Sequence, residues 1–372
     1  MIEGGILPQG GGDIILLFYY FIFKDMDISS YFKQAIEQKA SDLHLASGSI
    51  PALRLEGELV KLNHGVLEGK EMEQAVRTLV DEKTWERFNR KRELDFSQEF
   101  FGARFRVNLH YQEGKIALSA RLIPSKIPSP QEIGLSENVY NLTHLRDGLI
   151  IVTGPSGSGK STTLAVMLDI INKERRAHII TIEDPIEYMF EEKQSIIEQR
   201  ELGSDTMTFA SALKYALRQD PNVIMVGEMR DLETISAVLT AAETGHLVLS
   251  TLHTATAPEV IARIVDVFPS HQQQQILNQL SSTLRAVVAQ HLLPGIKGDR
   301  VAAREIMINN SAIANLIRRN QVGQIYTVIQ TSQKEGMITM NKAVDKLLQA
   351  GLISGKVAQT RKRDLETQAA YF

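Results

Sequence analysis

The 372-residue sequence contains no cysteine. This absence excludes disulfide bonds, zinc sites built on thiolates and cysteine nucleophiles. An excess of positive charge is also missing, because 41 basic and 44 acidic residues give a formal net charge of −3. The chain as a whole therefore has no strong electrostatic attraction to nucleic acid or anionic lipid, and we interpret the basic runs at 90–92 and 361–363 as solvated helix faces.

The amino terminus lacks a hydrophobic run long enough to cross a bilayer. Residues 14–23 are apolar throughout (IILLFYYFIF), but these ten residues fall short of the ~20 that a spanning helix needs. The run also lacks the basic flank and the small-residue cleavage site of a signal peptide. We expect residues 1–25 to be a disordered extension or the product of a start assigned too far upstream. A membrane-touching anchor is the alternative.

Residues 26–123 are expected to form a small α+β domain. Hydrophobic and charged fractions of 43% and 23% are those of a soluble globular protein, and the length favours two domains. The patterns predict a helix over 29–39 with Asp27 and Ser29 or Ser30 as caps, and a hairpin turning at 56–57. They also predict a helical stretch over 68–91 and strands at 103–112 and 115–123. Three prolines then mark residues 124–134 as a linker.

The pattern changes after the linker. Nearly continuous apolar runs occur at 149–152, 179–182, 223–226 and 247–249, separated by stretches long enough for helices. Such runs are typical of a parallel sheet covered on both faces, so residues 135–272 are predicted to be a doubly wound α/β fold. From residue 273 to the end the pattern favours helices almost throughout, including QILNQLSSTLRAVVAQHLL. We therefore expect a second domain over 135–372.

A phosphate-binding loop follows the first apolar run. GPSGSGKS at 154–161 matches G-x-x-x-x-G-K-[ST] after a predicted strand and before a predicted helix. Its backbone N–H groups and Lys160 would contact the phosphates of ATP, and the Ser161 hydroxyl would contact Mg²⁺. The candidate nucleotide-binding residues are Gly154, Pro155, Ser156, Gly157, Ser158, Gly159, Lys160, Ser161 and Thr162.

Polar residues end the other apolar runs as well. Glu183, Glu228 and His253 each follow one run, and ligands of parallel sheets bind at the carboxyl ends of the strands. Glu228 is our first candidate for orienting the attacking water, and Glu183 is the second. Gly227 occupies the place of the usual aspartate, so contact between Glu228 and Mg²⁺ is expected to pass through water.

Two histidines flank the fourth run and are expected to lie far apart. The seven-residue interval between His246 and His253 covers roughly 23 Å if it is mainly strand, because each residue advances ~3.3 Å. Both side chains cannot then touch one phosphate. We assign His253 to the γ-phosphate, while a structural or interface role for His246 is as well supported as a functional one.

The predicted strand at 103–112 carries cations on one face. Apolar residues alternate with Arg104 and Arg106, and Arg121 lies on the predicted partner strand. Two interpretations stay open. The arginines form a solvated face, or they are arginine fingers for a nucleotide, including one bound by a neighbouring subunit.

Four segments carry a family resemblance that extends over nearly the whole chain after Met26. They are GPSGSGKSTTLAVMLDIIN, TIEDPIEY, DPNVIMVGEMRDLETISAVLTAAETGHLVLSTLHT and RIVDVFP. Together they resemble the secretion-type ATPases, in particular the PilT-type pilus retraction ATPases. The resemblance implies a hexameric ring of subunits, each with a PAS-like amino-terminal domain and a RecA-like ATPase domain. It also implies a place at the cytoplasmic face of the inner membrane, a platform protein as partner with a paralogous retraction ATPase as another, and no nucleic acid.

The resemblance also implies roles for the candidate residues. Residues 154–162 are similar to the Walker A loop, 181–187 to the aspartate box with Glu183 acidic, and Glu228 to the catalytic glutamate of an atypical Walker B motif. His246 and His253 match the histidine box. Arg104, Arg106 and Arg121 fall where the family carries nucleotide-contacting arginines.

Two further features bear on the branch of the family. Assembly and type II secretion ATPases usually carry a four-cysteine zinc element, which a chain without cysteine cannot form, so retraction is favoured. The retraction branch carries a helix resembling A-I-R-N-L-I-R, whereas residues 312–318 have Ala314 in place of the first arginine. Ile313, Leu316 and Ile317 keep the spacing of a buried helical face.

Other functional classes remain as alternatives. A RecA-like nucleic-acid translocase would show hydrolysis stimulated by single-stranded DNA, but the acidic balance weighs against it. Another secretion-system ATPase is also compatible with the motifs. A scaffold that binds ATP without hydrolysing it is less well supported, since Lys160 and Glu228 are both present.

Overall fold

The computed structural model describes residues 27–55, 57–124 and 126–369, with the backbone alone from 363 onward. The chain divides into two compact units at residues 124 and 125, and each is treated by itself. The expectations for residues 1–25 lie outside the described residues. Among those described, no helix is both long and apolar enough to cross a membrane.

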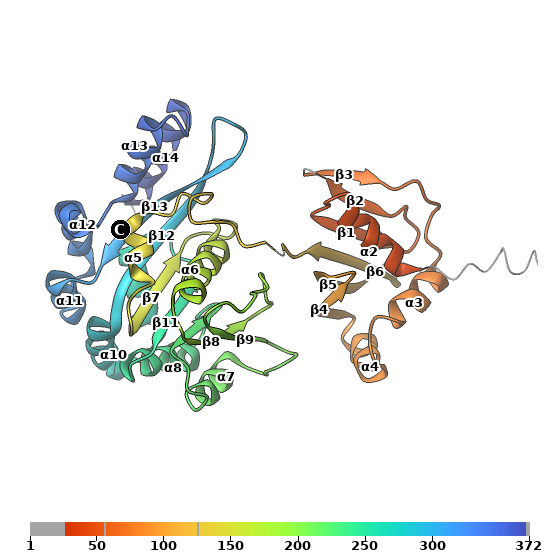
Figure 1. The fold of residues 1–372 in the computed structure, drawn as a ribbon, viewed down its shortest axis with the longest axis horizontal. Coiled ribbons are helices and arrows are strands. Elements are labelled where there is room, and N and C mark those ends of the chain that lie inside the picture. The colour runs from red at the N-terminus through yellow and green to blue at the C-terminus, as the bar shows by residue number, and fades with distance from the viewer. Residues whose placement is uncertain (1–26, 56, 125, 370–372) are drawn as a thin grey trace, which may run out of the picture. The chain divides into compact units, whose positions relative to one another are not determined.

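In its described residues, the first unit contains a six-stranded antiparallel sheet and three helices (Figure 1). The strand order is β3-β2-β1-β6-β5-β4. The elements are α2 (Ile28–Glu37), β1 (Asp42–Ala46), β2 (Ala52–Leu55), β3 (Glu58–Lys61), α3 (Gly69–Arg77), α4 (Glu82–Lys91), β4 (Glu93–Phe100), β5 (Ala103–Gln112) and β6 (Lys115–Leu122). Asp27 caps α2 through a hydrogen bond from the Ser29 N–H, as predicted. The expected helical stretch over 68–91 is two helices, because Asp81 caps a new start at α4, and strand β4 was not predicted.

The core of this unit lies on one face of the sheet. Phe32 of α2 stacks on Phe100 and meets the edge of Phe105, and Trp85 and Phe88 of α4 belong to the same buried cluster. The alternation predicted for β5 is confirmed, because Phe105 is buried and its neighbour Arg106 is exposed. The polar residues of β5 therefore share the opposite face.

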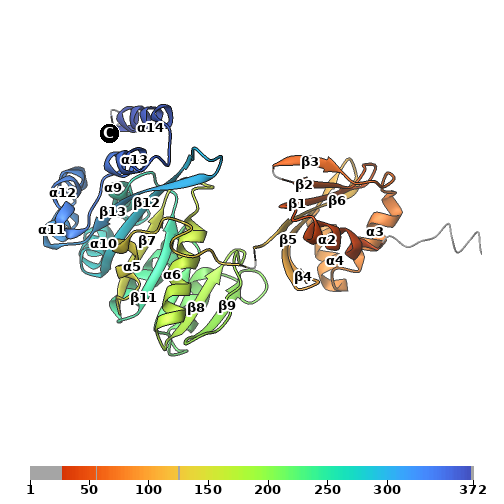
Figure 2. The same ribbon diagram turned by 45° about the horizontal axis from the view of Figure 1, so that its top comes forward.

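The second unit is a seven-stranded sheet with helices on both faces (Figures 1 and 2). The strand order is β13-β12-β7-β11-β10-β8-β9, and all pairs are parallel except β12 with β13. The predicted apolar runs form β7 (Gly148–Thr153), β8 (His178–Glu183), β10 (Val223–Val226) and β11 (Leu247–Leu252). The other elements are α5 (Glu137–Leu142), α6 (Lys160–Glu174), β9 (Ile196–Glu201), α7 (Phe209–Ala216), α8 (Leu232–Glu243), α9 (Ala257–Asp266), α10 (Ser270–Thr283), β12 (Leu284–Pro294), β13 (Arg300–Ile308), α11 (Ser311–Arg318), α12 (Ile325–Thr331), α13 (Met340–Gln349) and α14 (Gly355–Ala369).

Two separate cores confirm the doubly wound prediction. Ile151 of β7 packs with α8 and α9 on one face, whereas its neighbours Ile150 and Val152 pack with α5 and α6 on the other. Because successive strand residues point to opposite faces, a strand covered on both sides must be apolar at every position. This explains the continuous runs in the sequence.

The prediction of helix throughout the carboxyl-terminal part is wrong over 284–308. Helix α10 ends at Thr283, and Leu284–Pro294 forms β12, which pairs in parallel with β7 and antiparallel with β13. Nearly every residue of β12 is buried, so the segment has no period-2 pattern to distinguish it from a buried helix. The sheet consequently gains two strands beside the phosphate-binding loop.

Candidate functional site

The loop at 154–159 joins β7 to α6 as predicted. Gly157 and Gly159 have φ angles of 74° and 84°, in the left-handed region that glycine adopts without strain. A Cβ on Gly154 would lie 2.2 Å from the Gln290 carbonyl oxygen of β12. Glycine at 154 is therefore required by the close approach of the neighbouring strand, and the loop is held directly against β12.

Lys160 begins helix α6 and is buried within the loop. Its ammonium group donates to the carbonyl oxygens of Gly154, at 2.9 Å, and Pro155, at 3.1 Å. Burial lowers the pKa of Lys160, and the negative charges of Glu187 and Glu228 act in the opposite direction. The charge of this lysine thus lies where two acidic side chains and the loop carbonyls converge.

The loop also carries polar groups suited to a phosphate. Ser158 is buried, and among the described residues its hydroxyl finds no hydrogen-bond partner. Ser161 is half-buried in the first turn of α6, and the Thr162 hydroxyl lies 2.9 Å from that of Tyr188. An unpartnered hydroxyl, a lysine and the amino end of a 15-residue helix in one place fit the oxygens of a nucleotide phosphate.

Glu228 lies two residues beyond β10, at the same edge of the sheet. Its carboxylate is 3.4 Å from Nε2 of His253, and it also forms an ion pair with Arg230. On its other side the His253 ring places Nδ1 3.4 Å from the Lys160 ammonium nitrogen. The Thr251 hydroxyl donates to the Gly227 carbonyl and so fixes the backbone next to Glu228. The structure therefore brings Lys160, His253 and Glu228 together, from the ends of three parallel strands.

Glu183 lies at the end of β8 but is turned into the protein. Its carboxylate accepts hydrogen bonds from the Thr181 hydroxyl at 2.7 Å, the Gln199 amide at 3.3 Å and the Glu187 N–H at 3.4 Å. Burial raises the pKa of Glu183 to about 7, although these hydrogen bonds oppose the shift. Glu187, four residues later and exposed, is the carboxylate of this segment whose charge acts on Lys160. The sequence reasoning did not single it out.

We expect Glu183 to make the stability of the chain depend on pH. Because its pKa in the folded chain is about 7, above the ordinary 4.5, the contribution of Glu183 to the free energy of unfolding is fully present below pH 4.5 and is lost as the pH rises through about 7. The full change would be on the order of 3 kcal/mol. Glu183→Gln should flatten this dependence in denaturant titrations at several pH values. An unchanged profile in Glu183→Gln, or the same flattening in the exposed control Glu191→Gln, would contradict the assignment.

His246 lies at the opposite end of β11 from His253. Its Nδ1 is 3.0 Å from the Ala241 carbonyl and 3.1 Å from the Thr244 hydroxyl, at the end of α8. The six residues of β11 separate the two rings, so the expected separation of the histidines is confirmed. The contacts of His246 are those of a residue that terminates a helix, and the ring does not join the cluster around Lys160.

The three arginines lie in the first unit. Arg106 of β5 is directly opposite Arg121 of β6, and Arg121 forms an ion pair with Asp42 at 2.8 Å. Burial raises the pKa of Asp42, but hydrogen bonds from Arg121 and Ser41 outweigh it, and the net shift is downward. Like charges directly opposite each other destabilise a sheet. An anion bound at this face would relieve that repulsion.

Arg104, the third of these arginines, has a different setting. It is half-buried and directly opposite Glu99 of β4 in the antiparallel pairing. The acidic side chain of Glu99 offsets the positive charge of Arg104. Arg121, the neighbour of Arg106 on β6, is itself a cation and cannot offset the charge of Arg106. Of the predicted finger residues, Arg106 is therefore the one whose cross-strand setting leaves most positive charge on the exposed face.

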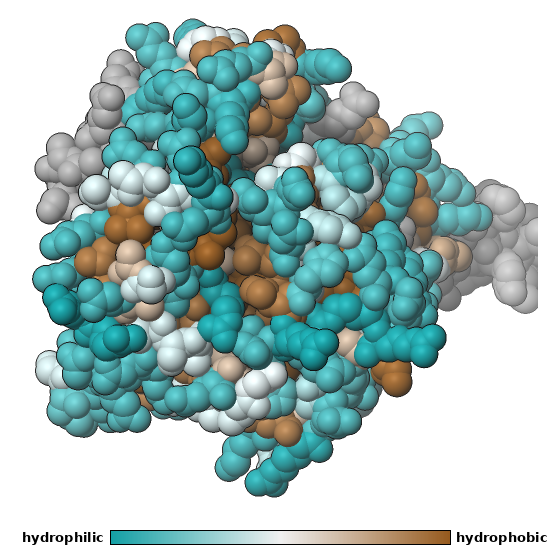
Figure 3. Space-filling view, turned by 60° about the vertical axis from the view of Figure 1, so that its left-hand side comes forward, coloured by the Kyte–Doolittle hydropathy of each residue, from teal (hydrophilic) through white to brown (hydrophobic). Residues whose placement is uncertain are grey.

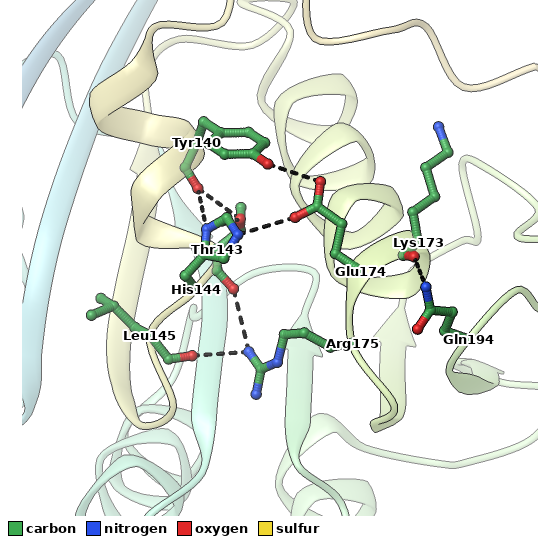
Figure 4. Close-up of polar contacts among 8 residues, drawn as sticks. All are labelled: Tyr140, Thr143, His144, Leu145, Lys173, Glu174, Arg175 and Gln194. Atoms are coloured by element: carbon green, nitrogen blue, oxygen red, sulfur yellow. Dashed lines mark hydrogen bonds and ion pairs between the residues drawn. The ribbon is translucent and has the colours of Figure 1, made fainter.

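Helix α6 is anchored at its far end as well as at the loop. Figure 4 shows the Glu174 carboxylate, at the last turn of α6, accepting from the Tyr140 hydroxyl at 2.9 Å and lying 3.0 Å from His144. The Arg175 guanidinium donates to the Leu145 carbonyl at 2.9 Å. These contacts fix α6 to α5 and the segment after it, so the loop is carried by a helix held at both ends.

A cavity of about 480 Å³ opens beside the loop. It is lined by Pro155, Ser156, Gly157, Ser158, His291, Leu292, Leu293, Pro294, Gly298, Asp299 and Arg300. Burial is the main reason that the pKa of His291 falls to about 4, so this ring is neutral at pH 7. The cavity therefore extends the site from the loop towards the connection between β12 and β13.

Comparison with known proteins places the chain in a family. Residues 132–361 match the family described as "Type II/IV secretion system protein". The "Type IV pilus retractation ATPase PilT" of Pseudomonas aeruginosa is 45% identical over 339 residues, which are 91% of this chain and 98% of the relative. The chain belongs to the PilT-type ATPases of this family. The predicted resemblance and ATPase activity are thereby confirmed.

A further relative and a solved structure agree with this placement. The "Twitching motility protein" of Neisseria gonorrhoeae is 44% identical over 321 residues, covering 86% of each chain. The solved structure described as "Crystal Structure of the Pilus Retraction Motor PilT and Bound ADP" is 47% identical, with a TM-score of 0.84, and covers 90% of this chain and 96% of its own. This likeness confirms the predicted fold class.

Proposed function

We propose that this PilT-type ATPase is the motor that powers type IV pilus retraction, working as a homo-hexamer at the cytoplasmic face of the inner membrane. The observation that supports it best is the meeting of Lys160, His253 and Glu228 at the carboxyl ends of β7, β11 and β10. A cation and a carboxylate at one phosphate-binding loop are parts that ATP hydrolysis needs for charge neutralisation and for orienting water, and the His253 ring lies between them. The family of the chain, with relatives named for pilus retraction and twitching motility, supplies the physiological setting.

In the proposed mechanism each group of the loop has one task. The loop N–H groups and Lys160 hold the β- and γ-phosphates, and Glu228 orients the attacking water and accepts its proton. His253, which faces Lys160 on one side and Glu228 on the other, contacts the γ-phosphate. Ser161 and, through water, Glu228 would hold Mg²⁺, which neutralises phosphate charge when bound. Glu183 supports this edge of the sheet from its buried position.

The remaining partners follow from the same proposal. Arg104, Arg106 and Arg121 would be supplied to a nucleotide held by a neighbouring subunit, as arginine fingers. A platform protein of the pilus would receive the mechanical work, and a paralogous retraction ATPase would be a second partner. Nucleic acid is not among the expected partners, and hydrolysis strongly stimulated by single-stranded DNA would favour a translocase instead.

The proposal is tested by two measurements on the full chain. Electron microscopy with a slowly hydrolysed ATP analogue should show six-fold rings. In its own host with the chromosomal copy deleted, the wild-type chain should restore pilus retraction, and the Glu228→Gln variant should not. Failure of an active ATPase to restore retraction would assign the motor to another task.

Helix α11 carries the departure from the retraction pattern at Ala314. Ile313, Leu316 and Ile317 are buried, which confirms the predicted packing face, whereas Arg318 is exposed after them. Figure 3 views the second unit from the side where α11 and α12 lie and shows a mainly hydrophilic surface with apolar patches. Replacement of an arginine by Ala314 therefore leaves the helix packed and removes one surface cation.

We expect Arg318 and Arg319 to supply the cationic contact that Ala314 lacks. Because both are exposed, Arg318→Ala/Arg319→Ala should keep normal ATPase activity and impair pilus retraction, measured in the deletion host. Gln349→Ala, at an exposed position of α13, is the control and should leave retraction unchanged. Arg175→Ala/Arg176→Ala would not serve as a control, because the Arg175 side chain donates hydrogen bonds to backbone carbonyls. Unchanged retraction in the double arginine variant would exclude the compensation.

A further inference from the structure

A buried polar cluster lies directly behind the phosphate-binding loop. The Gln290 side chain of β12, 1% exposed, donates to the Ser158 carbonyl at 2.6 Å and accepts from the Thr163 hydroxyl at 2.8 Å. Its amide thus spans from the last turn of the loop to the first turn of α6. The Lys160 and Ser161 positions lie between these two attachment points.

Arg304 of β13 holds this amide from the other side. Its Nε donates to the Gln290 side-chain oxygen at 2.8 Å. Its two terminal nitrogens donate to the Gly134 carbonyl at 2.8 Å and the Ile133 carbonyl at 3.0 and 3.1 Å. One of them also lies 3.5 Å from the Thr163 hydroxyl. All three nitrogens of the guanidinium are therefore engaged at once.

Burying Arg304 costs more free energy than filling the same space with an apolar side chain would. Arg304 is 7% exposed, and each acceptor named above is a neutral oxygen rather than a carboxylate. Burial lowers the pKa of Arg304 to about 10, so the group remains charged at pH 7. Burying a charge without an opposite charge carries an energetic penalty that an apolar side chain would avoid. What the guanidinium group provides is a planar fork of donors, which joins several backbone and side-chain groups in one fixed geometry.

The carbonyls of Ile133 and Gly134 end a short turn in the segment that leads in from the first unit. Ser129 and Glu132 stabilise the start of this turn, since each backbone N–H donates to the other's side chain. Arg304 holds its end. Residues 129–134 are thus attached to β13 through the same arginine that donates a hydrogen bond to Gln290.

We propose that Arg304, acting through Gln290, is a positioning residue for the phosphate-binding loop, and that it makes the loop conformation depend on the segment 129–134. Gln290 sets the distance between the loop and α6, and Arg304 fixes the plane of the Gln290 amide. A movement of the loop on nucleotide binding is transmitted to 129–134 through the hydrogen bonds of Gln290 to Ser158, of Arg304 to Gln290, and of Arg304 to the carbonyls that end the turn. The first turn of the second unit, just after the boundary between the units, thereby responds to nucleotide.

Steady-state kinetics of two variants test the positioning role. Because the loop holds the phosphates in both the ground and transition states, Gln290→Leu and Arg304→Met should raise KM for ATP about tenfold with little change in kcat. Arg176→Met and Gln349→Leu, at exposed positions of the same unit, should leave both constants unchanged. A lowered Tm with an unchanged KM would show that the cluster is only structural. Gln290→Asn, which keeps the amide but withdraws it from the loop, should also raise KM and serves if Arg304→Met does not fold.

Hydrogen exchange tests the coupling to the segment. In the wild-type chain, saturating Mg²⁺ and ADP should slow amide exchange in peptides that cover 129–136. In Arg304→Lys, whose single ammonium group cannot join the same acceptors, this response should be lost while exchange in α6 is still slowed. An equal response of 129–136 in both chains would overturn the coupling, and so would the absence of any response in the wild type.

Discussion

Glu228→Gln is expected to keep ATP binding and to lower kcat by a factor on the order of 10² to 10⁴, because the amide, unlike the carboxylate, cannot accept the proton of the attacking water. The amide has the same shape and can still lie beside His253. Lys160→Ala should instead abolish binding, because it removes the cation that lies between the loop carbonyls and the two acidic side chains. The two defects should therefore separate into one of turnover and one of affinity.

Calorimetry with ATP and a phosphate-release assay measure these two effects. Glu233→Gln, an exposed acid-to-amide change in the first turn of α8, is the matched control and should behave as wild type. Wild-type-like hydrolysis in Glu228→Gln would transfer the role of the base to Glu183 or Glu187. Glu187 is the stronger of these two, because the Glu183 carboxylate is already occupied by Thr181 and Gln199.

The convergence at the loop was predictable because it rests on local signals. GPSGSGKS is a contiguous motif, and the runs that became β7, β8, β10 and β11 are buried on both faces. Once the strands are taken as parallel, their carboxyl ends must share one edge, which brings Glu228 and His253 to the loop. Which carboxylate of the segment after β8 acts on Lys160 was not predictable, because it depends on the direction that the chain takes after the strand.

The cluster behind the loop could not be found from the sequence. Gln290 and Arg304 lie in β12 and β13, which were predicted to be helical because buried strands lack a period-2 pattern. A polar residue in a supposed helix has no evident relation to a loop more than a hundred residues away. Only the pairing of β12 with β7 places Gln290 against Gly154 and Ser158.

The first unit shows a similar limit. Alternation along β5 correctly separates Arg104 and Arg106 from the buried face. The sequence does not show that Arg106 lies opposite Arg121, or that Asp42 neutralises Arg121, because both depend on the register between strands that are distant in the chain. These contacts make Arg106 the strongest candidate for an arginine finger among the three arginines.

Arg106→Ala is accordingly expected to slow hydrolysis by about 10³ to 10⁵, the contribution of an arginine finger, with a much smaller effect on ATP binding. Arg121→Ala should have the same direction and a smaller effect, since its guanidinium is already paired with Asp42. The fold should survive, because Arg106 is exposed and β5 is held by Phe105 and Val107 on its buried face. Arg90→Ala, at an exposed position of α4, is the control.

Mixed rings decide whether Arg106 acts on a neighbouring subunit. In a ring whose interfaces are all head-to-tail, a site acting in trans combines Lys160 of one subunit with Arg106 of the next. Equal amounts of Arg106→Ala and Lys160→Ala subunits should then restore about one interface in four, although each variant alone is inactive. The expected result is that ATPase activity, measured as phosphate release, recovers when the two variants are mixed. If mixing restores nothing while electron microscopy shows that the subunits share rings, Arg106 acts within its own subunit or belongs to a solvated face.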